Sequence, residues 1–223
     1  MLRILKNISL LLLLSLFISC CKDDDNGTGA DSKTIRIPQE VKDYMQFKTG
    51  TWWLYEDSVS LATDCVYVTA SSQGFDTVYE AGHIKQIYEY FSWTCHNTFE
   101  NFDHRYYVHQ SWYESVDGTK VFYNKFDNIN STTMVIFTFP YVLNKFYGSG
   151  FFSYDTTYYQ NVYSNYSVDT LQFTDVVQTL FKNYDYEINK DTKFYLAKQA
   201  GIVRRDIPDR NRFWKIKAYH SIK

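Results

Sequence analysis

Aromatic residues recur along this chain in short segments that are separated by turn residues. Tyr, Phe and Trp make up 19% of the 223 residues, whereas Gly and Pro number only 9 and 3. Aromatic and β-branched side chains favour strands, because they cover a pleated, half-buried surface well. Few Gly and Pro, together with 45% hydrophobic residues, exclude a disordered low-complexity chain. The composition therefore predicts an all-β protein with one sizeable core.

The spacing of these segments predicts about ten strands, as in a sandwich or a barrel. Asp117-Gly118 predicts a tight hairpin, because both residues tolerate positive φ. At most one short helix is expected, between Pro38 and Phe47. The expected strands are residues 50–56, 64–69, 84–95, 105–114, 119–126, 132–139, 151–159, 176–181, 193–198, 202–205 and 212–219.

The N-terminus has the features of an export signal. Arg3 and Lys6 precede an apolar run from Ile8 to Ile18, which is shorter than the ~20 residues of an ordinary membrane-spanning helix. The run ends in Leu16-Phe17-Ile18-Ser19-Cys20-Cys21, which resembles a lipobox. That resemblance implies cleavage before Cys20 and attachment of lipid to its thiol, with Cys21 as the second candidate. A plain signal peptide and a signal anchor are the alternatives.

These signals divide the chain into three parts. Residues 1–19 are the expected lipoprotein signal peptide, residues 20–37 a lipidated polar tether, and residues 38–223 a single β-rich domain. Lys22-Asp23-Asp24-Asp25 resembles the signal that follows the lipid cysteine in surface-exposed lipoproteins of Bacteroidota. We therefore expect an outer-membrane lipoprotein on the cell surface, with a periplasm-facing lipoprotein as the alternative.

Both ends of the expected domain resemble small uncharacterised β-rich surface lipoproteins of Bacteroidota. The first end is Phe47 to Ser58, which resembles the Gly-x-Trp-x-Tyr strand of these proteins, followed by Asp64 to Thr69. The second end is Phe194 to Arg204, followed by Phe213 to Ile216. The resemblance covers about a third of the chain and implies an antiparallel meander, either a curved sheet or a calycin-like barrel. It implies no particular activity, and Cys65 departs from the more usual Ser.

Two cysteines, Cys65 and Cys95, lie beyond the expected anchor. Export would place them in an oxidising compartment, where paired thiols usually form a disulfide. Because they fall on strands that we expect to be neighbours, a Cys65–Cys95 disulfide is predicted. Two separate buried thiols, or a zinc site that also uses His96, are the alternatives, although the paired-ligand spacing of zinc sites is missing.

The sequence offers no specific catalytic or metal-binding pattern. Gly-x-Ser-x-Gly, His-Glu-x-x-His and Gly-rich phosphate loops are all missing from it. The net charge is −2, and acidic and basic residues are dispersed along the chain, so the sequence shows no cluster of basic residues that could bind nucleic acid. We therefore expect no cofactor, no metal, no nucleic-acid partner and no enzymatic activity.

Two further patterns concern the surface. Four positions resemble the Asp-Ser/Thr-apolar O-glycosylation signal of Bacteroidota, some loosely: Ser58, Thr77, Thr156 and Thr170. Aromatics on both faces of several strands could stack on sugars, or hold a lipid or a peptide. The candidate contacts are Trp52, Tyr90, Trp93 and Trp112. The alternative is that Tyr is simply suited to a sheet with both faces near solvent, where each hydroxyl reaches water.

These observations favour a membrane-anchored, non-catalytic module that binds a small ligand, a glycan or a peptide. A structural or envelope-assembly lipoprotein that acts through protein partners is the alternative. An aromatic-lined interior would favour the first function, and a filled core with an exposed apolar edge would favour the second.

The anchor can be tested by the substitution Cys20→Ala. Without this thiol the diacylglycerol has no attachment point, so the variant should accumulate as an unlipidated, uncleaved precursor. Incorporation of labelled palmitate and the size of the mature chain measure both effects, with Cys21→Ala as the matched control. Normal lipidation and cleavage of Cys20→Ala would contradict the assignment.

Overall fold

The computed structural model describes residues 33–110, 119–126, 131–144, 146–148, 156–183 and 190–223. Within them lie thirteen strands, one α-helix and one 3₁₀ turn, η1 (Pro208–Arg210). The helix is α2 (Gln39–Met45), and the strands are β1 (Lys33–Ile35), β2 (Trp52–Asp57), β3 (Thr63–Glu80), β4 (His83–Asn97), β5 (Phe102–Gln110), β6 (Thr119–Phe126), β7 (Ser131–Phe139), β8 (Phe146–Gly148), β9 (Thr156–Val168), β10 (Leu171–Asn183), β11 (Lys190–Ala197), β12 (Gly201–Ile207) and β13 (Arg212–His220).

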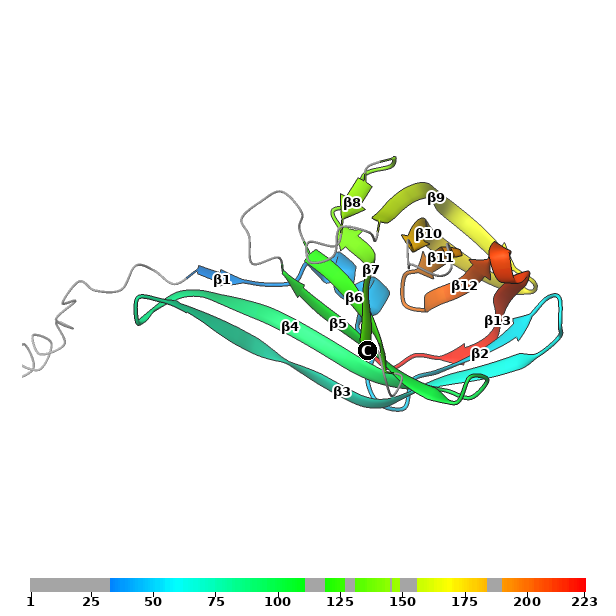
Figure 1. Cartoon of the computed structure of the whole chain (residues 1–223), viewed down its shortest axis with the longest axis horizontal. Coiled ribbons are helices and arrows are strands. Elements are labelled where there is room, and N and C mark those ends of the chain that lie inside the picture. The colour runs from blue at the N-terminus through cyan, green and yellow to red at the C-terminus, as the bar shows by residue number, and fades with distance from the viewer. Residues whose placement is uncertain (1–32, 111–118, 127–130, 145, 149–155, 184–189) are drawn as a thin grey trace, which may run out of the picture.

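All thirteen strands belong to one sheet (Figure 1). The strand order is β7-β6-β5-β4-β3-β2-β13-β12-β11-β10-β9-β8, and β1 pairs with β4 off this path. Strands β2–β7 and β8–β13 are thus two consecutive antiparallel meanders, which the pairing of β2 with β13 joins edge to edge. Among the described strands, only β1 is parallel to its neighbour.

The all-β prediction is confirmed, in the form of an open curved sheet with a short N-terminal helix. The strands number thirteen rather than about ten. The sheet bends far enough for Phe137 of β7 and Tyr159 of β9 to meet, with ring centroids 6.0 Å apart. The two end strands of the described sheet, β7 and β8, do not pair with each other, so the sheet remains open between them. The Asp117-Gly118 hairpin lies outside the described residues.

Helix α2 packs against the inner, concave face of the sheet. Its side chains Val41, Tyr44 and Met45 are at most 1% exposed. The Tyr44 hydroxyl donates a hydrogen bond to the carbonyl of Asp175 (2.7 Å), and its ring lies 5.5 Å from that of Phe137. The helix therefore contacts both meanders at once and fills the space between them.

Phe47, just after α2, continues this packing. Its ring meets Trp53 of β2 and Trp93 of β4 edge-on, at centroid distances of 4.9 and 5.6 Å. Trp53 is itself fixed by a hydrogen bond from its indole nitrogen to the carbonyl of Ala200 (2.6 Å). The inner face around α2 is thus covered by the protein's own aromatic side chains.

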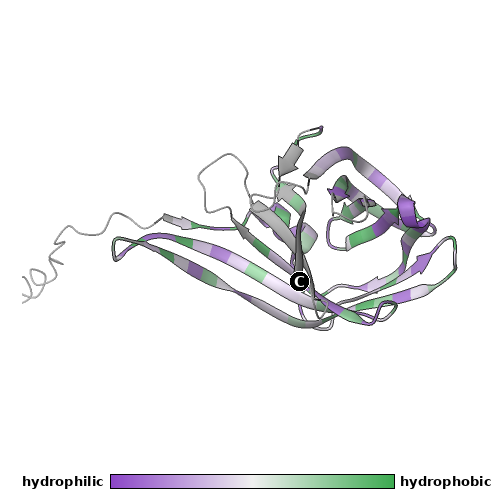
Figure 2. Ribbon diagram, in the orientation of Figure 1, coloured by the Kyte–Doolittle hydropathy of each residue, from purple (hydrophilic) through white to green (hydrophobic). Residues whose placement is uncertain are grey.

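Strands β3 and β4 extend beyond the body as a long hairpin, along which β1 also pairs with β4 at Gln86 to Tyr88 (Figure 1). Strand β2 pairs with β3 only up to Tyr67, and β5 pairs with β4 only from Tyr90 onward. We call residues 75–89 the arm. Hydrophilic and hydrophobic residues are interspersed along it (Figure 2). Its turn is made by Ala81 and Gly82, both at positive φ, as a two-residue hairpin requires.

The close contact between Gly201 and Phe47 can be tested with a matched pair of glycines. Gly201 (φ +79°) and Gly82 (φ +83°) share a conformation that L-residues rarely adopt. An added Cβ at Gly201 would lie 2.8 Å from Cζ of Phe47, whereas at Gly82 it would meet nothing within 4 Å.

We therefore expect Gly201→Ala to lower the free energy of unfolding by about 2–4 kcal/mol, and Gly82→Ala by only about 1 kcal/mol. Urea denaturation measures both values. Equal losses for the two variants would contradict the described packing of Phe47.

Candidate functional site

One row of side chains crosses five strands on the outer face of the sheet. The register pairs His220 of β13 with Trp52 of β2, and Trp52 with Tyr67 of β3. Tyr67 in turn pairs with His96 of β4, and His96 with Asp103 of β5. Directly paired residues of antiparallel strands lie on the same face. We call these five residues the cross-strand row.

Strand alternation places this row outside the core. Trp53 is buried at 4% exposure in the inner face, so its neighbour Trp52 points outward and is 37% exposed. On β3, Val68 is buried, and Tyr67 beside it is 40% exposed. Two large aromatic side chains on adjacent strands thus reach solvent together.

The row ends in a polar pair. Nδ1 of His96 lies 2.9 Å from Oδ1 of Asp103, and the imidazole is 5.3 Å from the ring of Tyr67. The carboxylate can hold the imidazole in one orientation while the second ring nitrogen stays available. The row therefore combines exposed ring faces with hydrogen-bonding groups.

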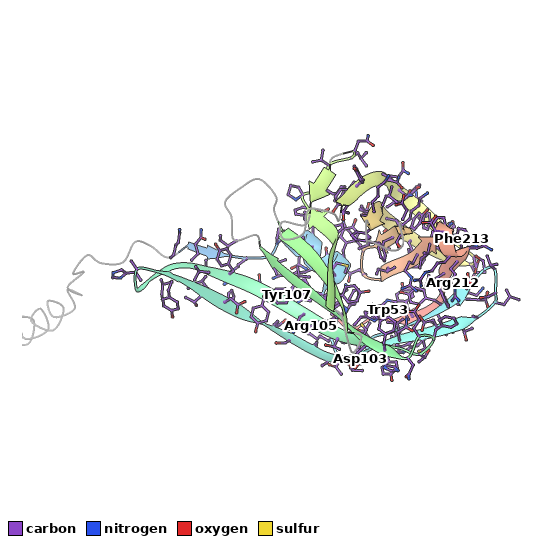
Figure 3. All side chains as sticks on the ribbon, in the orientation of Figure 1. Trp53, Asp103, Arg105, Tyr107, Arg212 and Phe213 are labelled. Carbon is purple, nitrogen blue, oxygen red and sulfur yellow. The ribbon has the colours of Figure 1, made fainter. Side chains whose placement is uncertain are left out.

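A second cluster extends this outer face along β4 and β5. Figure 3 labels Asp103, Arg105 and Tyr107, which occupy alternate positions of β5 and therefore lie on one face. Nη2 of Arg105 donates to Oγ of Ser92 (2.9 Å), and the guanidinium lies 5.8 Å from the Tyr107 ring centroid. The Tyr107 hydroxyl donates to Asp76 (3.1 Å). Burial, then the nearby Asp76 carboxylate, raises the pKa of Tyr107 to about 12, so it stays a neutral donor.

Tyr90 belongs to this second cluster. Its ring stacks on that of Tyr107 at 5.9 Å with an interplanar angle of 29°. It also lies against Gly74, where an added Cβ would come within 3.1 Å of the Tyr90 hydroxyl. Because Gly74 has no side chain, the Tyr90 ring can pack directly against the β3 backbone.

The four aromatic residues predicted to contact a ligand differ in their exposure to solvent. Trp52 is exposed in the cross-strand row, and Tyr90 is half-buried in the second cluster. Trp93 was wrongly predicted to contact a ligand: it is 2% exposed on the inner face and stacks on Tyr106 at 4.8 Å. Trp112 lies outside the described residues.

The predicted Cys65–Cys95 disulfide is also wrong, since both are free cysteines. The strands are neighbours as expected, but Cys95 pairs with Val68, three residues from Cys65. That offset is about 10 Å along the strand, and an odd offset turns the two side chains to opposite faces. Burial raises the pKa of both thiols, which disfavours the reactive thiolate.

The predicted modification sites remain predictions. Ser58, Thr77 and Thr170 are exposed, although the Ser58 hydroxyl donates to the carbonyl of Phe213 (3.0 Å). Cys20 and Cys21 lie outside the described residues, as does the side chain of Thr156.

Among the described residues, no group of three or more His, Cys, Asp or Glu side chains could hold a metal ion. The same residues contain no helix with the length and apolar character needed to cross a membrane.

Tyr67, Asp103 and His220 were not predicted as site residues, and His96 was considered only for the alternative zinc site. The alternation from Asp64 to Thr69 already indicated that Tyr67 faces away from Val66 and Val68. Its alignment with Trp52 and His96 depends on the strand register, which the sequence pattern alone did not provide.

Comparisons with known proteins found no matching family model, no matching curated protein and no matching solved structure. The resemblance to Bacteroidota lipoproteins therefore remains a prediction from the residues that carry it.

The state of the two thiols can be tested on protein purified from its native host. We expect Cys65 and Cys95 to be alkylated in denaturant without any reductant, because their side chains face opposite sides of the sheet. Peptide mapping by mass spectrometry measures this for each cysteine separately. A disulfide-linked pair of peptides containing Cys65 and Cys95 would contradict the strand register.

Proposed function

We propose that this chain is a membrane-anchored, non-catalytic binding lipoprotein whose ligand binds across the outer face of the sheet. The observation that carries the proposal is the cross-strand row, in which Trp52 and Tyr67 are exposed side by side on paired strands. The inner face is a poorer candidate, because α2 and Phe47 already cover it.

A glycan is the ligand class that suits this surface best. Exposed aromatic rings bind the apolar faces of sugar rings, and polar groups beside them bind the hydroxyls. The His96–Asp103 pair supplies donors and acceptors at one end of the row, and His220 supplies them at the other. An open face rather than a deep cavity would let an extended chain lie across several strands.

The location is proposed from the N-terminal sequence. The lipobox-like segment supports attachment through Cys20, and the aspartates after Cys21 support display on the outer-membrane surface. Protease treatment of intact cells tests the display, because a surface protein should be digested. Full protection would favour the periplasm-facing alternative.

An envelope-assembly role through protein partners is the second candidate. It is favoured by the filled inner face, which is the outcome expected for this role. It is also favoured by the arm, where β3 from Gly74 to Glu80 pairs only with β4 within the described chain. An open strand edge of this kind can accept a strand from another protein.

The binding proposal predicts the effect of removing either ring. A glycan array carrying linear microbial and plant oligosaccharides identifies the ligand, and calorimetry measures its affinity. Trp52→Ala and Tyr67→Ala should each weaken binding by about 1–2 kcal/mol, or roughly tenfold, because each removes one stacking face.

Tyr79→Ala is the matched control for these variants. It also removes an exposed tyrosine from β3, but from the arm rather than the row. An equal loss in the control, or no glycan binding by the unaltered protein, would contradict the proposal.

A further inference from the structure

The described chain begins beside the arm. Strand β1 runs parallel to β4, and Lys33 pairs with Gln86, only four residues after the turn residue Gly82. Figure 1 shows β1 alongside β4 where the arm leaves the body. Lys33, the first described residue, therefore lies beside the arm.

Three large apolar side chains are exposed on this arm. Phe75, Tyr79 and Ile84 are 48%, 64% and 42% exposed. Tyr79 is paired directly with Ile84, so their side chains lie together at the tip. Phe75 precedes Tyr79 by four residues on β3, an even spacing that places it on the same face.

Basic groups accompany these apolar side chains. The guanidinium of Arg36 lies 5.3 Å from the ring centroid of Phe75. His83 is exposed next to the turn. Aromatic and aliphatic side chains flanked by Lys and Arg are typical of segments that lie at a membrane–water interface.

We propose that the end of the arm docks on the lipid surface in which the Cys20 lipid is inserted. The proposal rests on the proposed anchoring through Cys20. Residues 21–32 can separate Lys33 from the lipidated Cys20 by at most about 47 Å, even when fully extended.

A short linkage of this kind supports even weak docking. It keeps the arm at an effective concentration in the millimolar range near the membrane. A contact through three side chains then suffices, although it would not hold a free protein on the membrane. Docking would also orient the body, with the cross-strand row fixed relative to the membrane by the β3 and β4 strands that it shares with the arm.

The experiment uses the lipidated full-length chain in phosphatidylcholine vesicles, with or without bromine on the acyl chains. Bromine quenches tryptophan fluorescence only within the lipid. The substitution Tyr79→Trp adds a reporter at the arm tip. Its added fluorescence is expected to fall by roughly half or more in brominated vesicles, as for an interfacial aromatic residue.

Leu61→Trp is the matched control. Leu61 is 69% exposed in the turn between β2 and β3, near the opposite end of β3 from the arm tip. Its added fluorescence should be the same in both kinds of vesicle. The five native tryptophans form a constant background in both variants.

Flotation of the vesicles separates the two possible failures. If the protein floats but Tyr79→Trp is not quenched, the docking proposal is wrong while the anchor stands. If the reporter is shielded from aqueous iodide but not quenched by bromine, a protein partner or a second copy covers the arm, which also overturns docking. If the protein does not float, both the anchor and the docking fail.

Discussion

The packing of α2 and Phe47 against the inner face is the contact on which the rest of this structure depends. The helix touches Phe137 in one meander and Asp175 in the other, so it holds together a sheet whose end strands do not pair. It also fills the concave side with aromatic side chains. A curved sheet of this size could otherwise have enclosed a ligand. Here the exposed side chains that could recognise one lie on the outer face.

The pairing of β2 with β13 has a comparable role on that outer face. It joins the two meanders, and its register places His220 beside Trp52. The row then continues through β3, β4 and β5 by simple antiparallel pairing. The candidate site is therefore made of residues from distant parts of the chain, aligned by backbone hydrogen bonds, with a direct side-chain contact between His96 and Asp103.

Aromatic and β-branched composition sufficed to predict the all-β class, and the pattern from Pro38 to Phe47 sufficed to predict the short helix, because both depend on local sequence. Strand lengths were harder: β3 runs on to Glu80 through Ser71, Ser72, Gln73 and Gly74, residues with little strand preference that pair with a long β4. Cys65 and Cys95 show the limit most clearly. Their strands are neighbours as expected, but a three-residue offset separates the thiols. Which of Trp52 and Trp93 faces solvent likewise depended on where α2 packs.

We propose that recognition occurs on the outer face, because the inner face is filled. Nuclear magnetic resonance of the protein with the bound oligosaccharide tests this most directly. Binding at the outer face should shift the indole signal of Trp52 and the imidazole signals of His96 and His220, while the indole signals of Trp53 and Trp93 stay in place. Shifts concentrated on Trp53, Trp93 and the residues of α2 would contradict it, because they would place the ligand inside the curved sheet.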